Sequence, residues 1–223
     1  MLTATLKKQF ESLLGGPLDW PARPAPEMLP SGIREVDEAT GGLPRGCLTE
    51  IVGPASSGRT SLLLSILAQA TARAEICALV DAEDAFDPAS AAAAGVRLER
   101  LIWVRSRSAE SALKASDLLI HGGGFGVVVL DLGDTPPAAA RRISLTSWFR
   151  LRRAVEHTPT VLVAVARHSN AGTCASLMLA CARERIEWSG APRASRLLRG
   201  MQARATSTKR TMVCSPVFTA VAL

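Results

Sequence analysis

The residues best suited to chemistry lie in a glycine-rich loop at Gly53–Thr60, within the stretch Leu48–Gln69. The loop reads GPASSGRT, follows an apolar segment and precedes an apolar helix. In this context the backbone N–H groups of such a loop cradle phosphate oxygens, and the helix N-terminus adds partial positive charge. The sequence therefore predicts a phosphate-binding loop whose contributing residues are Gly53, Ser56, Ser57, Gly58, Arg59, Thr60 and Ser61.

One loop position departs from the usual pattern, because Arg59 stands where such loops carry a lysine. A lysine there is a slim point charge, whereas a guanidinium is broader, planar and stiffer, so the exchange is not conservative at a tight site. Two interpretations follow: Arg59 pairs with a bound phosphate, or it points into solvent and the loop serves as a scaffold. We also expect Gly58 to stay small so that a ligand can approach.

Acidic residues at two predicted strand ends supply the second part of this chemistry. Asp131 closes the apolar run GVVVLDL, where an aspartate can orient a magnesium ion held by the Thr60 hydroxyl. Glu83 lies in the segment VDAEDAFDP and could polarise an attacking water as a general base. Asp87, in the same segment, is included among the predicted nucleotide-binding residues. The alternatives are a strand-end cap for Asp131 and a solvated acidic turn for the segment.

These residues need a scaffold that brings them to one edge of a sheet. Apolar runs predict strands at residues 49–52, 75–81, 101–104, 126–132 and 160–166. Helices are predicted at residues 31–39 with Ser31 as N-cap, at 60–69, 88–94, 109–120 and 138–156. Residues 173–223 are expected to form strands and turns. The alternation predicts an α/β domain with a mostly parallel central sheet, helices on both faces and an antiparallel C-terminal edge.

The chain is predicted to have three parts. Residues 1–16 form an amphipathic helix whose apolar stripe includes Leu6 and Phe10. Residues 17–30 contain five prolines and read as an extended linker. Residues 31–223 form the core domain. A helix on such a linker packs on its own domain or reaches a neighbouring protein, and we favour a partner.

Composition argues against several classes of protein. The five cysteines are scattered, with no CxxC pair, so neither a zinc site nor a disulfide framework is expected. No run of about 18 apolar residues is present, so no membrane span is expected. The first residues lack the basic-then-apolar pattern of a secretion signal, which predicts a cytoplasmic protein.

Charge is unevenly distributed along the chain, whose formal net charge is +6. Residues 1–136 carry 12 basic and 17 acidic residues, a net −5, whereas residues 137–223 carry 14 basic and 3 acidic residues, a net +11. This asymmetry favours an anionic partner, with single-stranded DNA first, for the C-terminal part. The basic residues proposed to contact it lie on one predicted helix and are Arg142, Arg150 and Arg153. A solvated helix face and an arginine-rich genome composition are the alternatives.

Taken together, these motifs resemble the core of the RecA recombinases. The run LPSGIREVDEATGGLPRGCLTEIVGPASSGRTSLLL is similar to the RecA segment that leads into the phosphate loop. VDAEDAFDP resembles the motif in which a glutamate activates water, and GVVVLDL resembles the magnesium-aspartate strand. The resemblance covers roughly residues 29–188 and implies a RecA-like P-loop fold with ATP and Mg²⁺ as cofactors.

The departures from that pattern point to a particular branch. Besides Arg59, the chain has Ala89–Ala91 where recombinases carry an aromatic that stacks on adenine, and Arg167 where they carry a γ-phosphate-sensing glutamine. The connection HSNA replaces a long DNA-binding loop. A short, arginine-rich core of this kind resembles the ImuA family, which implies a non-recombinase role in SOS mutagenesis with RecA, ImuB and an error-prone replicative-type polymerase as partners.

Two functions follow from the sequence. The first is an accessory protein of SOS-induced translesion synthesis with weak or absent ATPase activity, which acts through protein contacts and DNA. Its N-terminal KKQF segment resembles the helix by which RecA protomers join. The second is a DNA-dependent ATPase of the RecA class, with Glu83 as base and with Thr60 and Asp131 on magnesium. A nucleotide-gated switch that binds without hydrolysis lies between them.

Overall fold

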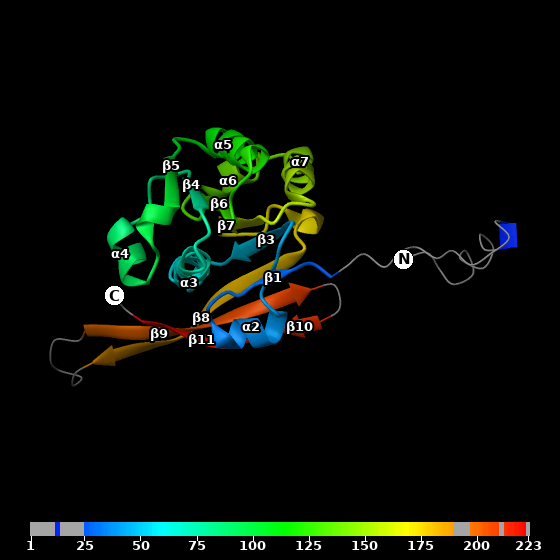
Figure 1. Ribbon diagram of the computed structural model, residues 1–223. Coiled ribbons are helices and arrows are strands. Elements are labelled where there is room, and N and C mark those ends of the chain that lie inside the picture. Colours follow the sequence, from blue (N-terminus) through cyan, green and yellow to red (C-terminus); the bar gives the residue numbers. More distant parts are fainter. Residues whose placement is uncertain (1–11, 14–24, 190–196, 210–211, 222–223) are drawn as a thin grey trace.

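The computed structural model describes residues 12–13, 25–189, 197–209 and 212–221 (Figure 1). Within them a 9-stranded sheet has the order β10-β9-β8-β3-β7-β6-β4-β5, and β11 pairs with β9. Strands β3 to β8 run parallel to one another. Their bounds are Cys47–Val52 for β3, Cys77–Asp81 for β4, Leu101–Arg105 for β5, Val127–Leu132 for β6, Val161–Ala166 for β7 and Leu177–Ser189 for β8. The arrangement confirms the predicted α/β class.

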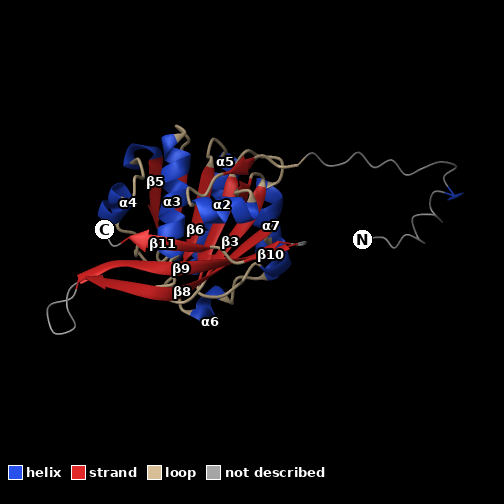
Figure 2. Ribbon diagram, turned by 90° about the horizontal axis from the view of Figure 1, so that it is seen from below, coloured by secondary structure: helices blue, strands red, loops and turns tan. Residues whose placement is uncertain are grey.

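The predicted antiparallel C-terminal edge is also present. Strand β9 (Leu197–Lys209) runs antiparallel to β8, and both β10 (Met212–Cys214) and β11 (Val217–Val221) run antiparallel to β9. Figure 2 shows β8 and β9 as a long two-stranded ribbon that extends beyond the other strands. This edge bends back toward the phosphate loop, because buried side chains of β9 and β11 join the core cluster that also contains α3.

Helices cover both faces of the parallel strands, as Figure 1 shows. Side chains alternate between the faces, since Val127 and Val129 join the core cluster beneath α3 and α4, whereas Val128 and Leu130 join the cluster beneath α5 and α7. Burial on both faces explains why such strands read as continuous apolar runs. The helices span Arg59–Ala72 for α3, Pro88–Ala93 for α4, Ala109–Gly122 for α5 and Leu145–Val155 for α7. No helix among the described residues is long and apolar enough to cross a membrane.

The single helix predicted at residues 138–156 is wrong, because the structure divides it. A short helix α6 (Pro137–Ala140) is followed by a turn, and α7 begins after Ser144. The Ser144 hydroxyl accepts a hydrogen bond from the Ser147 N–H at 3.2 Å. A serine that bonds to a nearby backbone N–H favours a helix start over a helix interior, which accounts for the break.

The N-terminal boundary also differs from expectation. Helix α2 (Arg34–Thr40) begins later than predicted, and Ser31 is not its N-cap. Instead the Asp37 carboxylate accepts the backbone N–H groups of Ser31 and Gly32. Upstream, β1 (Met28–Leu29) pairs with β2 (Leu43–Pro44), so the folded part begins before residue 31. Most of the predicted N-terminal helix, including Leu6 and Phe10, lies outside the described residues.

Candidate functional site

The phosphate loop lies between β3 and α3 at the carboxyl edge of the parallel strands. Gly58 has φ +92° and immediately precedes α3. A Cβ on Gly58 would lie 2.7 Å from the Ala203 Cβ and 3.1 Å from the Phe218 ring. Gly58 must therefore be small because β9 and β11 pack against the loop, a reason that differs from the predicted approach of a ligand.

A cavity of about 300 Å³ opens beside the loop. Its wall combines loop residues with acidic residues of two other segments. The predicted site residues that line it are Ser56, Arg59, Thr60, Asp87 and Asp131. Glu83 is exposed and does not line this cavity, nor do Gly53, Ser57, Gly58 and Ser61. The structure thus brings together the loop and the magnesium-aspartate position, and it leaves the predicted general base outside.

Arg59 points into the protein. Its side chain is buried, with 7% of the residue exposed, and its Nη1 donates a hydrogen bond to the Gly133 carbonyl oxygen at 3.2 Å. The interpretation that Arg59 points into solvent is therefore wrong. Burial lowers the pKa of Arg59, while the charges of Asp131 and Asp134 oppose this shift. An arginine stays protonated in proteins, so a positive charge sits permanently in the wall of the cavity.

Asp131 occupies the end of β6 within the same cavity. Its Oδ1 accepts a hydrogen bond from the Gly133 N–H at 2.8 Å. Burial raises the pKa of Asp131 to about 6, although the Gly133 N–H and the charge of Arg59 lower it. The carboxylate is thus costly to ionise and is partly balanced by the arginine beside it.

Two oxygen donors in the cavity, the Thr60 hydroxyl and the Asp131 carboxylate, are candidate ligands for Mg²⁺. Within the described part of the chain no group of three or more His, Cys, Asp or Glu residues could hold a metal. Thr60 and Asp131 nevertheless line one cavity. One hydroxyl and one carboxylate are the kinds of oxygen ligand that Mg²⁺ prefers, so Thr60 and Asp131 would hold the ion if it binds.

A second arginine donates a hydrogen bond to the Gly133 carbonyl oxygen, which also accepts from Arg59. Arg167, directly after β7, donates from Nε to the Gly133 carbonyl oxygen at 3.3 Å, and its Nη2 lies 3.7 Å from Asp134 Oδ1. Two guanidinium groups from different elements therefore converge on the Gly133 carbonyl. Arg59 approaches from the start of α3 and Arg167 from the end of a central strand.

A buried glutamate that sequence reasoning missed holds the segment after Arg167. Glu50, in β3, is 1% exposed. Its carboxylate accepts the Ser169 hydroxyl at 2.7 Å and the backbone N–H groups of Asn170 and Ala171 at 2.6 and 2.9 Å. The signal in the sequence is an acidic residue inside the apolar strand CLTEIV. Such a residue needs hydrogen-bond partners to be buried.

An aromatic side chain in the cavity was also missed. The sequence has no aromatic residue at positions 88–91, after Asp87, where the resemblance predicts one. Phe86, just before Asp87, lines the cavity instead. Its ring packs edge-on against Trp103, with centroids 5.3 Å apart. Asp87 caps α4 and accepts the Ser90 hydroxyl at 2.6 Å, and this hydrogen bond lowers the pKa of Asp87. The Asp87 carboxylate is therefore engaged with its own helix.

The basic residues predicted to contact DNA lie away from this cavity. Arg142, Arg150 and Arg153 are exposed, and Arg150 Nε donates to Asp117 Oδ1 at 3.3 Å across to α5. The apolar arc of α7 is partly buried, since Trp148 is 1% exposed whereas Phe149 is 42% exposed. Arg142 lies in the turn before α7, so the three arginines are not on one helix as predicted. Of the two on α7, Arg150 is already paired with Asp117.

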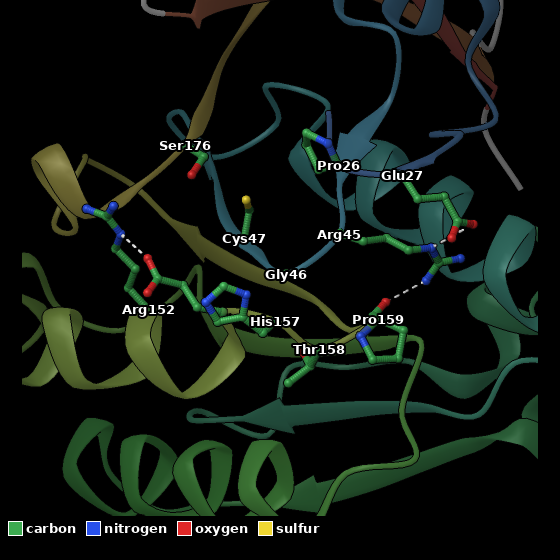
Figure 3. A pocket seen from close by; sticks show the side chains of 11 residues that line it. Pro26, Glu27, Arg45, Gly46, Cys47, Arg152, His157, Thr158, Pro159 and Ser176 are labelled. Atoms are coloured by element: carbon green, nitrogen blue, oxygen red, sulfur yellow. Dashed lines mark hydrogen bonds and ion pairs between the residues drawn. The ribbon is translucent and has the colours of Figure 1, made fainter. Parts of the chain in front are cut away.

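The opposite edge of the sheet carries a different cavity, of about 450 Å³, shown in Figure 3. It lies at the amino ends of β3, β7 and β8. Arg45 pairs there with Glu27, and Arg152 pairs with Glu156. Its arginines are thus neutralised internally. Open α/β sheets bind ligands at the carboxyl ends of their strands, so we assign the candidate site to the phosphate-loop edge.

The chain is similar to known proteins over the segment that carries the candidate site. Residues 21–138, which include the loop, Glu83 and Asp131, match the family described as the RecA N-terminal domain. Protein RecA of Chloroflexus aurantiacus is 34% identical over 158 residues, 64% of this chain and 45% of that protein. Protein RecA of Methylococcus capsulatus is 44% identical over 107 residues, 47% of this chain and 31% of that protein. Protein RecA of Mesorhizobium japonicum is 35% identical over 153 residues, 61% of this chain and 42% of that protein. The chain spans less than half the length of these relatives.

Proposed function

The chain belongs to the RecA N-terminal domain family, and from this premise we propose that it is a non-recombinase accessory protein of SOS-induced translesion synthesis. It acts through contacts with partners rather than through ATP turnover. The observation that carries the proposal is the position of Arg59, whose buried guanidinium donates to Gly133 inside the phosphate cavity. A group that should meet phosphate is instead held by the protein backbone.

The loop retains a structural role without a nucleotide. Gly58 allows Ala203 and Phe218 of the C-terminal strands to pack against it. Thr60 is exposed, and Asp131 is already hydrogen-bonded to Gly133. These contacts support a loop maintained as part of the fold.

The proposed partners are RecA, ImuB and an error-prone replicative-type polymerase, with single-stranded DNA as a further ligand of Arg142, Arg150 and Arg153. For RecA the proposed mechanism is competition, in which residues 1–28 cap or interrupt a RecA filament. The test is RecA strand exchange in the presence of the full chain and of a chain lacking residues 1–28. Unchanged inhibition after the deletion would reject the capping mechanism.

The decisive measurement for the loop is nucleotide affinity, determined by isothermal titration with a non-hydrolysable ATP analogue and Mg²⁺. We expect Arg59→Lys to bind roughly 10-fold more tightly than the unaltered chain, because it frees space over the phosphates; this corresponds to about 1.4 kcal/mol. A second variant that combines Arg59→Lys with Thr60→Ala should lose the gain. Tight binding by the unaltered chain, equal to that of Arg59→Lys, would contradict the proposal.

A DNA-dependent ATPase is the second candidate, favoured by one observation. Ser56, Thr60 and Asp131 line one cavity together with Phe86. In this function Mg²⁺ would neutralise phosphate charge, and Thr60 and Asp131 would hold it. Glu83 would orient the attacking water. ATP turnover that is stimulated by single-stranded DNA and abolished by Glu83→Gln would establish this function in place of the first.

A further inference from the structure

A separate cavity of about 290 Å³ lies beyond the Gly133 carbonyl. It is formed by the turn between β6 and α6 and by the connection after β7. None of its lining residues lines the phosphate-loop cavity. The side chains that decide its chemistry are those of Thr135, Arg141, Arg167 and His168.

Thr135 marks this cavity as a site. The residue is 2% exposed, and its Oγ1 has no hydrogen-bond partner among the residues that the structure describes. Its backbone N–H does have a partner, the Leu132 carbonyl oxygen at 3.2 Å, so only the side-chain hydroxyl is unpaired. Buried hydroxyl groups normally have a partner, because an unpaired one loses its hydrogen bonds to water. The residue that carries this unpaired hydroxyl lines the cavity of about 290 Å³.

The charges around Thr135 are mainly positive. Arg141 donates from Nε to the Pro137 carbonyl oxygen at 3.1 Å, and within the described chain no carboxylate pairs with it. Arg167 forms an ion pair with Asp134 at 3.7 Å and donates from Nε to the Gly133 carbonyl oxygen at 3.3 Å. His168 is exposed and also lines the cavity. Because the charged residues that line the cavity are the two arginines, its wall favours an anion.

The other nearby carboxylate, Glu50, forms no ion pair with Arg141 or Arg167 among the described residues. It is engaged with the Ser169 hydroxyl and with the N–H groups of Asn170 and Ala171. These contacts hold the connection after Arg167 in place, so the arginine is presented on a fixed backbone. They also occupy the donors of that connection, which leaves the anion to the side chains of Thr135, Arg141, Arg167 and His168.

We propose that this cavity binds a terminal phosphate group, that is, inorganic phosphate or the phosphate of a phosphomonoester. Arginine forks match phosphate oxygens, and a hydroxyl adds a further donor. Because Thr135 is almost fully buried, a group that reaches its hydroxyl must be at the end of its ligand. An internal phosphodiester carries a substituent on each side and does not meet this condition. The inference goes beyond the proposed function, which concerns the loop cavity and its partners.

The test uses the full chain and two forms of the ligand. Isothermal titration with inorganic phosphate measures the free anion, and fluorescence anisotropy compares an oligonucleotide that carries a 5′-phosphate with the same oligonucleotide that carries a 5′-hydroxyl. We expect Arg141→Gln and Thr135→Val each to weaken phosphate binding roughly 10-fold, as loss of one hydrogen bond to a charged group does. Thermal unfolding of Thr135→Val should match the unaltered chain, which separates lost binding from lost folding.

Arg73→Gln is the matched control, because it removes the same charge from an exposed position at the end of α3, outside both cavities. It should bind phosphate like the unaltered chain. Binding that is unchanged in Arg141→Gln and Thr135→Val overturns the proposal. Binding that is lost in Thr60→Ala instead assigns the phosphate to the loop cavity and also overturns it. Equal binding of the 5′-phosphate and 5′-hydroxyl oligonucleotides excludes a phosphorylated DNA end and leaves free phosphate as the ligand, provided that the titration shows it.

Discussion

Two cavities meet at the Gly133–Thr135 turn, and they differ in how their polar groups are satisfied. In the phosphate-loop cavity Arg59 donates to Gly133, Asp131 accepts from Gly133 and Asp87 is engaged with α4. In the neighbouring cavity the Thr135 hydroxyl has no partner, and Arg141 has no carboxylate partner among the described residues. The phosphate loop also carries an unpaired buried hydroxyl, that of Ser57, but Ser57 does not line the loop cavity, whereas Thr135 lines the neighbouring one.

The largest effect is expected at Glu50, which holds the connection after Arg167 that forms one wall of the second cavity. Glu50→Ala leaves three donors of residues 169–171 without their acceptor. We expect a loss of about 3–5 kcal/mol in the free energy of unfolding, measured by chemical denaturation. Glu50→Gln keeps one acceptor oxygen, so its free energy of unfolding should fall by clearly less than that of Glu50→Ala. Equal losses in the two variants would show that the negative charge, not the hydrogen bonds, matters.

The next effect tests whether the phosphate loop serves as a scaffold. Gly58→Ala places a Cβ 2.7 Å from the Ala203 Cβ at a φ of +92°. We expect a loss of roughly 2–3 kcal/mol in unfolding free energy, even without nucleotide, from overpacking and backbone strain. Gly122→Ala is the control, because nothing lies within 4 Å of its added Cβ. A Gly58→Ala variant as stable as the unaltered chain would separate the loop from the C-terminal strands.

A smaller effect concerns pH and the balance of charge around Asp131. Burial raises the pKa of Asp131 from 3.8 to about 6. Between these values the folded state binds more protons than the unfolded state, so the free energy of unfolding should fall as pH rises, by about 2 kcal/mol between pH 4 and pH 6. Asp131→Asn keeps an acceptor for the Gly133 N–H and should remove this part of the slope. An identical pH dependence in both proteins would contradict the burial of an ionisable Asp131.

The smallest change in stability is expected at Thr135, and it can be compared directly with the change at Thr71, a buried threonine whose hydroxyl is hydrogen-bonded. Thr135→Val removes a buried Oγ1 without a partner, so the free energy of unfolding should change by less than about 0.5 kcal/mol. Thr71→Val is the matched variant, because the Thr71 hydroxyl donates to Leu67 and accepts the Arg97 N–H. It should cost about 1–2 kcal/mol. Similar losses in both variants, measured by thermal unfolding, would mean that Thr135 has a partner in the free protein.

Much of the fold could be predicted from the sequence, because its strongest patterns are local. Runs such as GVVVLDL and TVLVAVA are long and apolar, so they predict central strands whatever lies around them. Element boundaries were less predictable. Ser144 interrupts a helix that the apolar periodicity alone extends. Helix α2 begins after Ile33 rather than after Ser31, whose own backbone N–H donates to Asp37.

For the site, the sequence predicted that Thr60 and Asp131 lie together, but it also predicted Glu83 there, which does not line the cavity. The strand-loop-helix order places Thr60 and Asp131 at the same sheet edge, and both line one cavity. The direction of Arg59 depends on Gly133, 74 residues away in the chain. Glu50 is 119 residues from Ser169, so its role in holding that connection could not be read from local spacing.

What the sequence determined by itself was the class of fold and the ancestry of the phosphate loop. These depend on apolar periodicity and on the spacing of Gly53, Gly58 and Thr60 in one short loop, which are properties of neighbouring residues. The tertiary structure alone decided that Arg59 is held by the backbone while Thr135 is left without a partner. Whether a polar group is satisfied depends on what the fold brings beside it.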